Sequence, residues 1–249
     1  MKSNRVISWA AFALLAWPGP AAAAPRTFDL AVKKPHLLGA SHGTLVVGDQ
    51  GVEYRTSDKK DARRWTYEQI RELQIASPSR IVVRTYEDQG WTRLWTDRSF
   101  AYEVTKGAVT PEVVAFLLDK MPRAVVTAVL PPLAGAPPYR VPVKHVRGRR
   151  GSEGDLVLYD QALVYRSPQP GASRFWRFND IASVLTLDPY RLQVTVYEGG
   201  GGPRPFTFEL KTPLPPGFYD RLWAFVNAPT PLRQTTGRLT LQEPRIAWR

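Results

Sequence analysis

The sequence of 249 residues contains no cysteine and only three histidines. Without cysteine, disulfides, thiolate zinc sites and cysteine nucleophiles are excluded. The histidines His36, His42 and His145 leave little material for a histidine-based metal site. No apolar run reaches the length of about 20 residues that a transmembrane helix needs. We therefore expect a fold stabilised by its hydrophobic core, with no metal and no cofactor.

Residues 1–23 are typical of a secretory signal peptide. A short positive start (Lys2 and Arg5) precedes an apolar core of 12 residues, 6–17, and four alanines follow it. Pro25 disfavours cleavage directly before it, so we expect cleavage after the second or third of these alanines. The segment predicts a periplasmic or secreted protein without a transmembrane segment once the signal is removed. An uncleaved N-terminal anchor is the alternative.

The chain is strongly basic, with 34 Lys and Arg against 22 Asp and Glu and a formal net charge of +12. Such a charge attracts anionic lipid head groups, acidic polymers and nucleic acid. In the predicted extracytoplasmic location, an anionic lipid or envelope polymer is favoured as the partner over nucleic acid. The alternative is a basic protein with no specific anionic partner.

An internal repeat appears when the sequence is shifted against itself by 111 positions. Between 31–87 and 142–198, 18 of 57 aligned pairs are identical, including Trp65 with Trp176. Chance predicts about 4 identities from average composition. We therefore predict a duplication of one unit of ordinary domain size.

The repeat predicts four segments after the signal peptide. The first copy spans residues 26–122 and the second copy spans 139–229. A proline-rich linker, 123–138, joins them, and a basic C-terminal tail, 230–249, follows. Prolines in the linker remove backbone donors and stiffen the chain, so we expect a short, semi-rigid connection.

Each copy has the pattern of a β-rich unit that ends in a helix. In the second copy, apolar residues alternate along 192–196 and 206–210, as in strands with one buried face. A helical stripe follows along 218–226. In the first copy, Thr110 and Pro111 suit the start of the equivalent helix. The predicted fold class is mainly β (α+β), with six to seven antiparallel strands per copy closed by a C-terminal helix.

This order of elements resembles the pleckstrin-homology-like (PH-like) superfamily, especially bacterial PH-like and GRAM-like domains. The resemblance covers residues 31–122 and 139–229, and it rests on a Gly-x-Leu-Val opening and a Trp-x-aromatic-x-x-Ile motif in each copy. The second motif consists of Trp65, Tyr67 and Ile70 in one copy and Trp176, Phe178 and Ile181 in the other. The resemblance implies two β-barrels that bind or scaffold rather than catalyse. A different small barrel or sandwich repeat is the alternative.

The resemblance also implies a place for an anionic ligand, the loop that joins the first two strands. Here these loops correspond to 33–43 and 144–154, and both are basic. The candidate ligand-binding residues are Lys33, Lys34, Lys144, Arg147, Arg149 and Arg150. The basic signature does not continue into the next strand, where Asp155 lies. A solvated basic loop is the alternative.

Three other features of the sequence are interpreted as structural and not as binding or catalytic sites. The basic run 59–64 has a nearly uncharged counterpart and is interpreted as a surface loop. The interleaved tryptophans and arginine of Trp91–Trp95 are interpreted as cross-strand pairs, with base, sugar or lipid contact as the alternative. No motif places a nucleophile beside a histidine, so we predict no enzyme. The favoured function is a binding module for an anionic envelope or membrane component, and the alternative is a protein-interaction scaffold.

Overall fold

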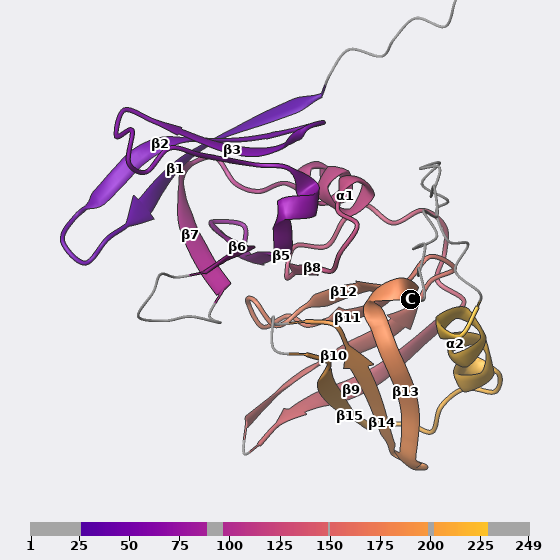
Figure 1. Cartoon of the computed structure of the whole chain (residues 1–249). Helices are drawn as coiled ribbons and strands as arrows, with labels where there is room; N and C mark the ends of the chain where they lie inside the picture. Colours follow the sequence, from indigo (N-terminus) through magenta and orange to yellow (C-terminus); the bar gives the residue numbers. More distant parts are fainter. Residues whose placement is uncertain (1–25, 89–96, 149, 199–201, 229–249) are drawn as a thin grey trace, which may run out of the picture.

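The computed structural model describes residues 26–88, 97–148, 150–198 and 202–228. The predicted signal peptide, the Trp91–Trp95 segment, Arg149 and the basic tail lie outside the described residues. Within them the chain is mainly β, as predicted, with two sheets and two α-helices (Figure 1). No helix in this part of the chain is both long and apolar enough to cross a membrane.

The first unit contains eight strands, a short 3-10 helix and one α-helix. Its elements are β1 (Thr27–Pro35), β2 (Ala40–Gly48), β3 (Gly51–Thr56), β4 (Arg63–Trp65), η1 (Tyr67–Gln69), β5 (Ile70–Ser77), β6 (Arg80–Asp88), β7 (Asp97–Lys106), α1 (Pro111–Lys120) and β8 (Val125–Thr127). They pair in the order β4-β3-β2-β1-β7-β6-β5-β8, all antiparallel except β5 with β8.

The second unit contains seven antiparallel strands, a 3-10 helix and one α-helix. Its elements are β9 (Tyr139–Arg147), β10 (Arg150–Leu158), β11 (Ala162–Arg166), β12 (Arg174–Arg177), η3 (Phe178–Asp180), β13 (Ile181–Asp188), β14 (Arg191–Val196), β15 (Arg204–Leu210) and α2 (Phe218–Val226). The strand order β12-β11-β10-β9-β15-β14-β13 matches that of the first unit without β8.

The strand ladders are open sheets. In the described strands, β4 and β8 end the first ladder, and β12 and β13 end the second. The closed barrel expected from the sequence therefore does not appear in the described ladders. What the structure shows is two curved, mainly antiparallel sheets, each followed in the chain by a helix.

Each sheet wraps an aromatic core built from its alternating inward residues. Trp65 packs on Phe100 at 4.8 Å between ring centroids, and Trp176 packs on Phe206 at 5.0 Å. Both tryptophans are buried, as the sequence predicts. Because period-2 alternation sends every second side chain inward, these rings meet across the sheet.

The segment 123–138 is part of the packed structure and not only a linker, which corrects the sequence-based expectation. Its residues 125–127 form β8, a parallel partner of β5. Further on, Leu130 and Leu133 pack on the outer face of the second sheet, beside Val157 and Phe175. Proline did not prevent this because the β8 residues precede the proline pairs of the segment.

The two units touch through this outer face. Figure 1 shows β11 and β12 facing α1 and β8. The Arg177 guanidinium lies at the contact and donates to the carbonyl oxygens of Leu118 (2.9 Å), Met121 (3.0 Å) and Arg123 (2.8 Å). It also forms an ion pair with Asp180. A cation at the C-terminal end of a helix complements the exposed carbonyls there.

Candidate anion-binding site

The two predicted basic loops are mostly strand. β1 and β2 pair up to Pro35 with Ala40, and β9 and β10 pair up to Arg147 with Arg150. Only short tips remain, and Gly148 begins the second tip with φ of 56°, a left-handed conformation that glycine adopts at no steric cost. The predicted loops are therefore wrong in extent, because the inward alternation of each strand continues almost to its tip.

This geometry separates the candidate residues onto two faces. Lys33 and Lys144 point to the outer face of their sheets. Lys33 forms an ion pair with Glu103 at 2.9 Å. Lys144 lies in register with Glu153 on one side and Glu209 on the other. Lys34 and Arg147 lie on the inner faces, so the predicted convergence of Lys144 with Arg147 is not present.

The inner face of the second sheet holds a cavity beneath the β9–β10 hairpin, which we call the hairpin pocket. Its volume is about 380 Å³, within the range of small-molecule sites. The pocket is lined by His145, Arg147, Gly151, Ser152, Gln169, Pro170, Gly171, Ala172 and Arg174. The lining contains arginines, a hydroxyl and an amide but none of its residues is acidic. Of the six candidates, Arg147 lies here.

His145 lies in the pocket beside two cationic side chains, those of Arg147 and Arg174. Its side chain is buried, with 6% exposure, and stacks on Phe206 at 5.0 Å between ring centroids. Burial, together with the charges of Arg147 and Arg174, lowers the pKa of His145 to about 4. The imidazole is therefore neutral at neutral pH, in an environment that disfavours a further cation.

The two arginines of the pocket differ in their partners. Arg174, which is half-buried, donates to the buried carboxylate of Glu198 at 2.9 Å. Burial raises the pKa of Glu198, although the charge of Arg174 opposes the rise. Arg147 is exposed and has no ion pair within the described residues. Arg147 is therefore the cationic side chain of the pocket that can bind an anionic ligand.

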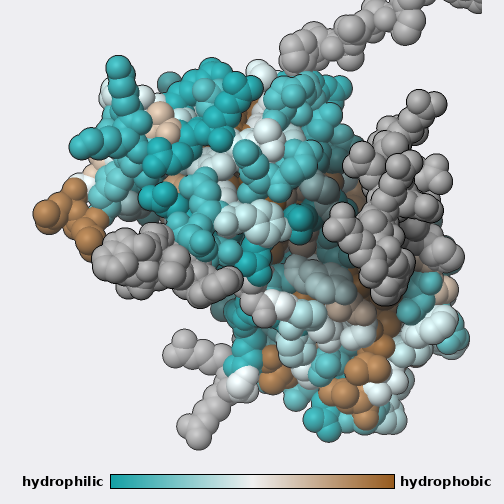
Figure 2. Space-filling model, in the orientation of Figure 1, coloured by the Kyte–Doolittle hydropathy of each residue, from teal (hydrophilic) through white to brown (hydrophobic). Residues whose placement is uncertain are grey.

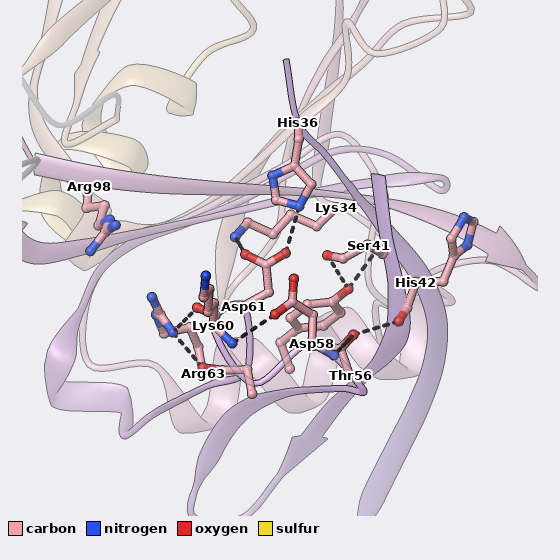
Figure 3. Close-up of polar contacts among 12 residues, drawn as sticks. Lys34, His36, Ser41, His42, Thr56, Asp58, Lys60, Asp61, Arg63 and Arg98 are labelled. Carbon is pink, nitrogen blue, oxygen red and sulfur yellow. Dashed lines mark hydrogen bonds and ion pairs between the residues drawn. The ribbon is translucent and has the colours of Figure 1, made fainter. Parts of the chain in front are cut away.

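The first unit carries a different arrangement in the matching place, which we call the Asp61 cluster: Lys34, His36, Ser41 and Asp61. Figure 3 shows Lys34 and His36 pointing at the Asp61 carboxylate. Lys34 Nζ lies 2.5 Å from Oδ1, and His36 Nε2 lies 2.7 Å from Oδ2. Exposure of the Asp61 and Lys34 side chains is 10% and 16%. Here the charge of Lys34 is balanced by a carboxylate of the chain itself.

The electrostatics of Asp61 follow from these contacts. Burial would raise its pKa, but hydrogen bonds from Lys34 and Ser41, the charge of Lys34 and the contact with His36 outweigh burial. Together they lower the pKa of Asp61 to about 2. The Ser41 hydroxyl also lies 3.1 Å from the Tyr54 hydroxyl. The serine and the histidine are each directed at the carboxylate, so this cluster is built as a buried ion pair and not as a nucleophile with its base.

Another cavity, also of about 380 Å³, lies between the units and is lined by Arg71, Tyr86, Arg123, Tyr197 and others. Its acidic residues are committed to arginines, since Glu72 accepts from Arg84 and Asp180 from Arg177. The mixed charge makes it a weaker anion site than the hairpin pocket. Within the described ranges, no group of three or more acidic or histidine side chains is placed to hold a metal ion.

Several residues of these sites were not singled out from the sequence. Ser152, Ala172 and Arg174 were not identified, and Asp61 was assigned to a surface loop. The signal was available in the repeat, because Asp61 aligns with Ala172 while Arg63 and Arg174 are identical. A buried carboxylate replaced by alanine, beside an unchanged arginine, marks a change of electrostatics in one inner site.

No protein-family model matches the sequence. A comparison with curated proteins finds no match. Among solved structures, the chain is similar to the Spt16D Pob3N heterodimer, at 10% identity over 70% of this chain and 84% of that chain, with a TM-score of 0.30. It is also similar to the C-terminal domain of an unknown protein from Leishmania infantum, at 11% identity over 30% of this chain and 69% of that chain, with a TM-score of 0.25. Similarities of this size carry no argument about fold or function.

Proposed function

We propose that the chain is an exported, non-enzymatic binding protein built from two duplicated PH-like units. The second unit binds an anionic group of an envelope or membrane component in the hairpin pocket. The observation that carries this proposal is the lining of the pocket. Among the described residues, Arg147 has no ion-pair partner and no acidic side chain lines the pocket beside it.

Matching local details support the duplication. Tyr54 donates to the Ser41 carbonyl at 3.0 Å, and Tyr165 donates to the Ser152 carbonyl at 2.6 Å. Both sheets share one strand order, and each is followed by a helix, which is the order of elements that suggested the PH-like family. The signal-like residues 1–23 support export.

The test is co-sedimentation of the purified protein with vesicles of phosphatidylcholine, with and without an anionic lipid. We expect binding to the anionic vesicles, with an affinity that falls as salt rises. Arg147→Gln should weaken binding about tenfold, the value of one charge-assisted contact. A soluble acidic polysaccharide, tested as a competitor, separates a polymer ligand from a lipid ligand.

Lys144→Gln is the matched control, because it removes the same charge from the same strand but from the outer face. It should bind almost as well as the wild type. Equal loss in both variants would mean that net charge, and not the pocket, drives binding. No binding by the wild-type protein to either anion would contradict the proposal.

A second candidate function, a protein-interaction scaffold, is supported by two surface features. Leu37 and Leu38 are almost fully exposed at the tip of the β1–β2 hairpin, and Figure 2 shows the hydrophobic projection there. β13 ends the second ladder within the described strands, and Leu185 and Leu187 on it are exposed. An edge strand can accept a peptide by β-augmentation.

This alternative predicts capture of one dominant protein partner that survives high salt and the Arg147→Gln change. The double change Leu37→Ser with Leu38→Ser should release a partner bound at the hairpin tip. Retention of the partner by this variant would move the interface to β13. Failure to retain any partner would remove the scaffold from consideration.

A further inference from the structure

The hairpin pocket and the Asp61 cluster are the same site in the two sheets. Lys34 lies opposite Ser41 across β1 and β2, and His145 lies opposite Ser152 across β9 and β10. In each unit the hydroxyl of a core tyrosine donates to the carbonyl of that serine. The floors of the two sites are therefore equivalent.

The loops that cover the two floors also have one geometry. The Asp61 amide donates to the Asp58 carbonyl at 3.0 Å, and the Ala172 amide donates to the Gln169 carbonyl at 3.1 Å. Arg63 donates to the carbonyls of the residues before and after Asp61. Arg174 makes the same two contacts around Ala172. Ala172 thus occupies the backbone position of Asp61.

The difference between the units is one carboxylate. In the first unit Asp61 fills the site and accepts from Lys34 and His36. In the second unit alanine stands in its place and a cavity of about 380 Å³ remains, with Arg147 where the repeat has His36. One unit supplies its own anion, and the other leaves the place open.

We infer that the hairpin pocket takes a carboxylate group of the ligand, which lies where Asp61 lies in the first unit. The inference rests on the proposed anion-binding function and names the chemical class that the pocket selects. Arg147 holds the carboxylate through its planar fork, whose geometry matches two carboxylate oxygens. Ser152 donates from the floor, as Ser41 does to Asp61.

Charge balance favours a monoanion such as a carboxylate over a dianionic phosphate. Arg174 is already neutralised by Glu198, and the imidazole of His145 is buried against aromatic rings. The pocket therefore offers one uncompensated positive charge within the described residues, that of Arg147. A monoanion balances this charge, whereas a dianionic phosphate would bring a second negative charge that has no cationic partner among the described residues.

The three histidines allow a direct test, because the NMR signal of each histidine is a probe of one site. His145 lies in the hairpin pocket, His36 lies in the Asp61 cluster, and His42 is exposed. We would record the ring carbon–proton NMR signals of the full chain while adding acetate at constant ionic strength at a pH of about 8, where inorganic phosphate is mainly a dianion. Acetate should shift His145 to saturation and leave His36 and His42 in place, while inorganic phosphate should bind about tenfold more weakly.

Two reciprocal variants test whether the two sites are equivalent: one adds a carboxylate to the second unit, and the other removes the carboxylate from the first unit. Ala172→Asp should supply the internal carboxylate, shift His145 without added ligand, and weaken acetate binding there about tenfold. Asp61→Ala should open the first unit, so that acetate now shifts His36. If Asp61→Ala does not fold, Ala172→Asp decides alone.

The outcomes separate this inference from the proposed function. If phosphate shifts His145 more strongly than acetate, and Arg147→Gln abolishes that shift, the anion site stands and the carboxylate class is wrong. If acetate binds Ala172→Asp as tightly as the wild type, the equivalence with Asp61 is wrong. If neither anion moves His145 at any concentration that leaves His42 unchanged, the anion-binding function itself is overturned.

Discussion

His145 shows how one side chain can set the electrostatics of a site without being charged. Lys34, at the same register position in the first sheet, forms an ion pair with Asp61 at 2.5 Å. Among the described residues that line the pocket, His145 has no acidic neighbour, and it lies near Arg147 and Arg174. A neutral ring on the aromatic core is therefore the stable state, and it leaves the charge of Arg147 for a ligand.

The stability of the protein should consequently depend on the titration of His145. Its pKa is lowered from 6.5 to about 4, so the unfolded chain binds a proton at a pH where the folded chain does not. The free energy of unfolding is then greatest above about 6.5 and falls as the pH drops towards 4, by about 3 kcal/mol from this group. Urea denaturation across this window measures the fall.

Two variants isolate the contribution of this residue. His145→Gln should be less stable at neutral pH but show a smaller fall, since no buried ring remains to take up a proton. His42→Gln, at an exposed position, should keep the full slope. An NMR titration of His145 gives its pKa independently of unfolding, and a value near 6.5 would disprove the lowered pKa.

At the scale of elements, the sequence predicted most of the strands and both helices. The alternating segments 192–196 and 206–210 lie in strands β14 and β15. The segment with the helical stripe, 218–226, forms α2. The error lay at the first hairpins, where basic residues were interpreted as loop. Lys33 and Lys144 are strand residues whose long side chains stay on the outer face, and charge alone does not distinguish that position from a loop.

The candidate site was predictable only in part for the same reason. Arg147 was identified from its place in a basic run, but its separation from Lys144 depends on the pleat. One-residue differences along a strand decide which face a side chain occupies. The pocket wall at Ala172 comes from a different hairpin, and only the pairing of β11 with β12 brings it to Arg147.

The tip of the β9–β10 hairpin should couple backbone conformation to binding. Gly148 has φ of 56°, and no atom of the described part of the chain lies within 4 Å of the place of an added Cβ. Gly148→Ala should therefore cost about 1 kcal/mol of stability through backbone strain alone, and it should loosen the neighbouring Arg147 and weaken anion binding. Denaturation and vesicle binding would be measured on the same preparation.

Gly135 provides the matched control. Its φ is 81°, its surroundings are equally open, and it does not line the hairpin pocket. Gly135→Ala should lose a similar amount of stability while binding anions like the wild type. Weaker binding in both variants would show that general destabilisation, and not the hairpin tip, controls the site.

At the scale of the whole molecule, the two units are not independent. The outer faces of β10, β11 and β12 carry Val157, Val164 and Phe175, which are covered by Leu118 and the segment after β8. The sequence contained a sign of this, since the run 162–165 is apolar without alternation, as in a strand buried on both faces. What it could not show was the partner, because the covering residues come from the predicted linker and from α1.

Arg177 should be the strongest single polar link between the units. Its guanidinium donates to three carbonyls at and beyond the end of α1 and pairs with Asp180. Arg177→Ala leaves these acceptors without their donor, and loss of such a network costs about 2–4 kcal/mol. We expect a lower melting temperature and, in calorimetry, separation of one cooperative transition into two as the units uncouple.

Limited proteolysis should locate the change, since the segment 128–138 would lose its cover and be cut faster than in the wild type. Arg221→Ala is the control, because the Arg221–Asp160 pair at 2.6 Å is solvent-exposed and of small expected value. It should unfold like the wild type, within about 0.5 kcal/mol. If Arg177→Ala also keeps a single transition at the wild-type temperature, the units are held together by the apolar contact of Leu118, Leu130 and Leu133 alone.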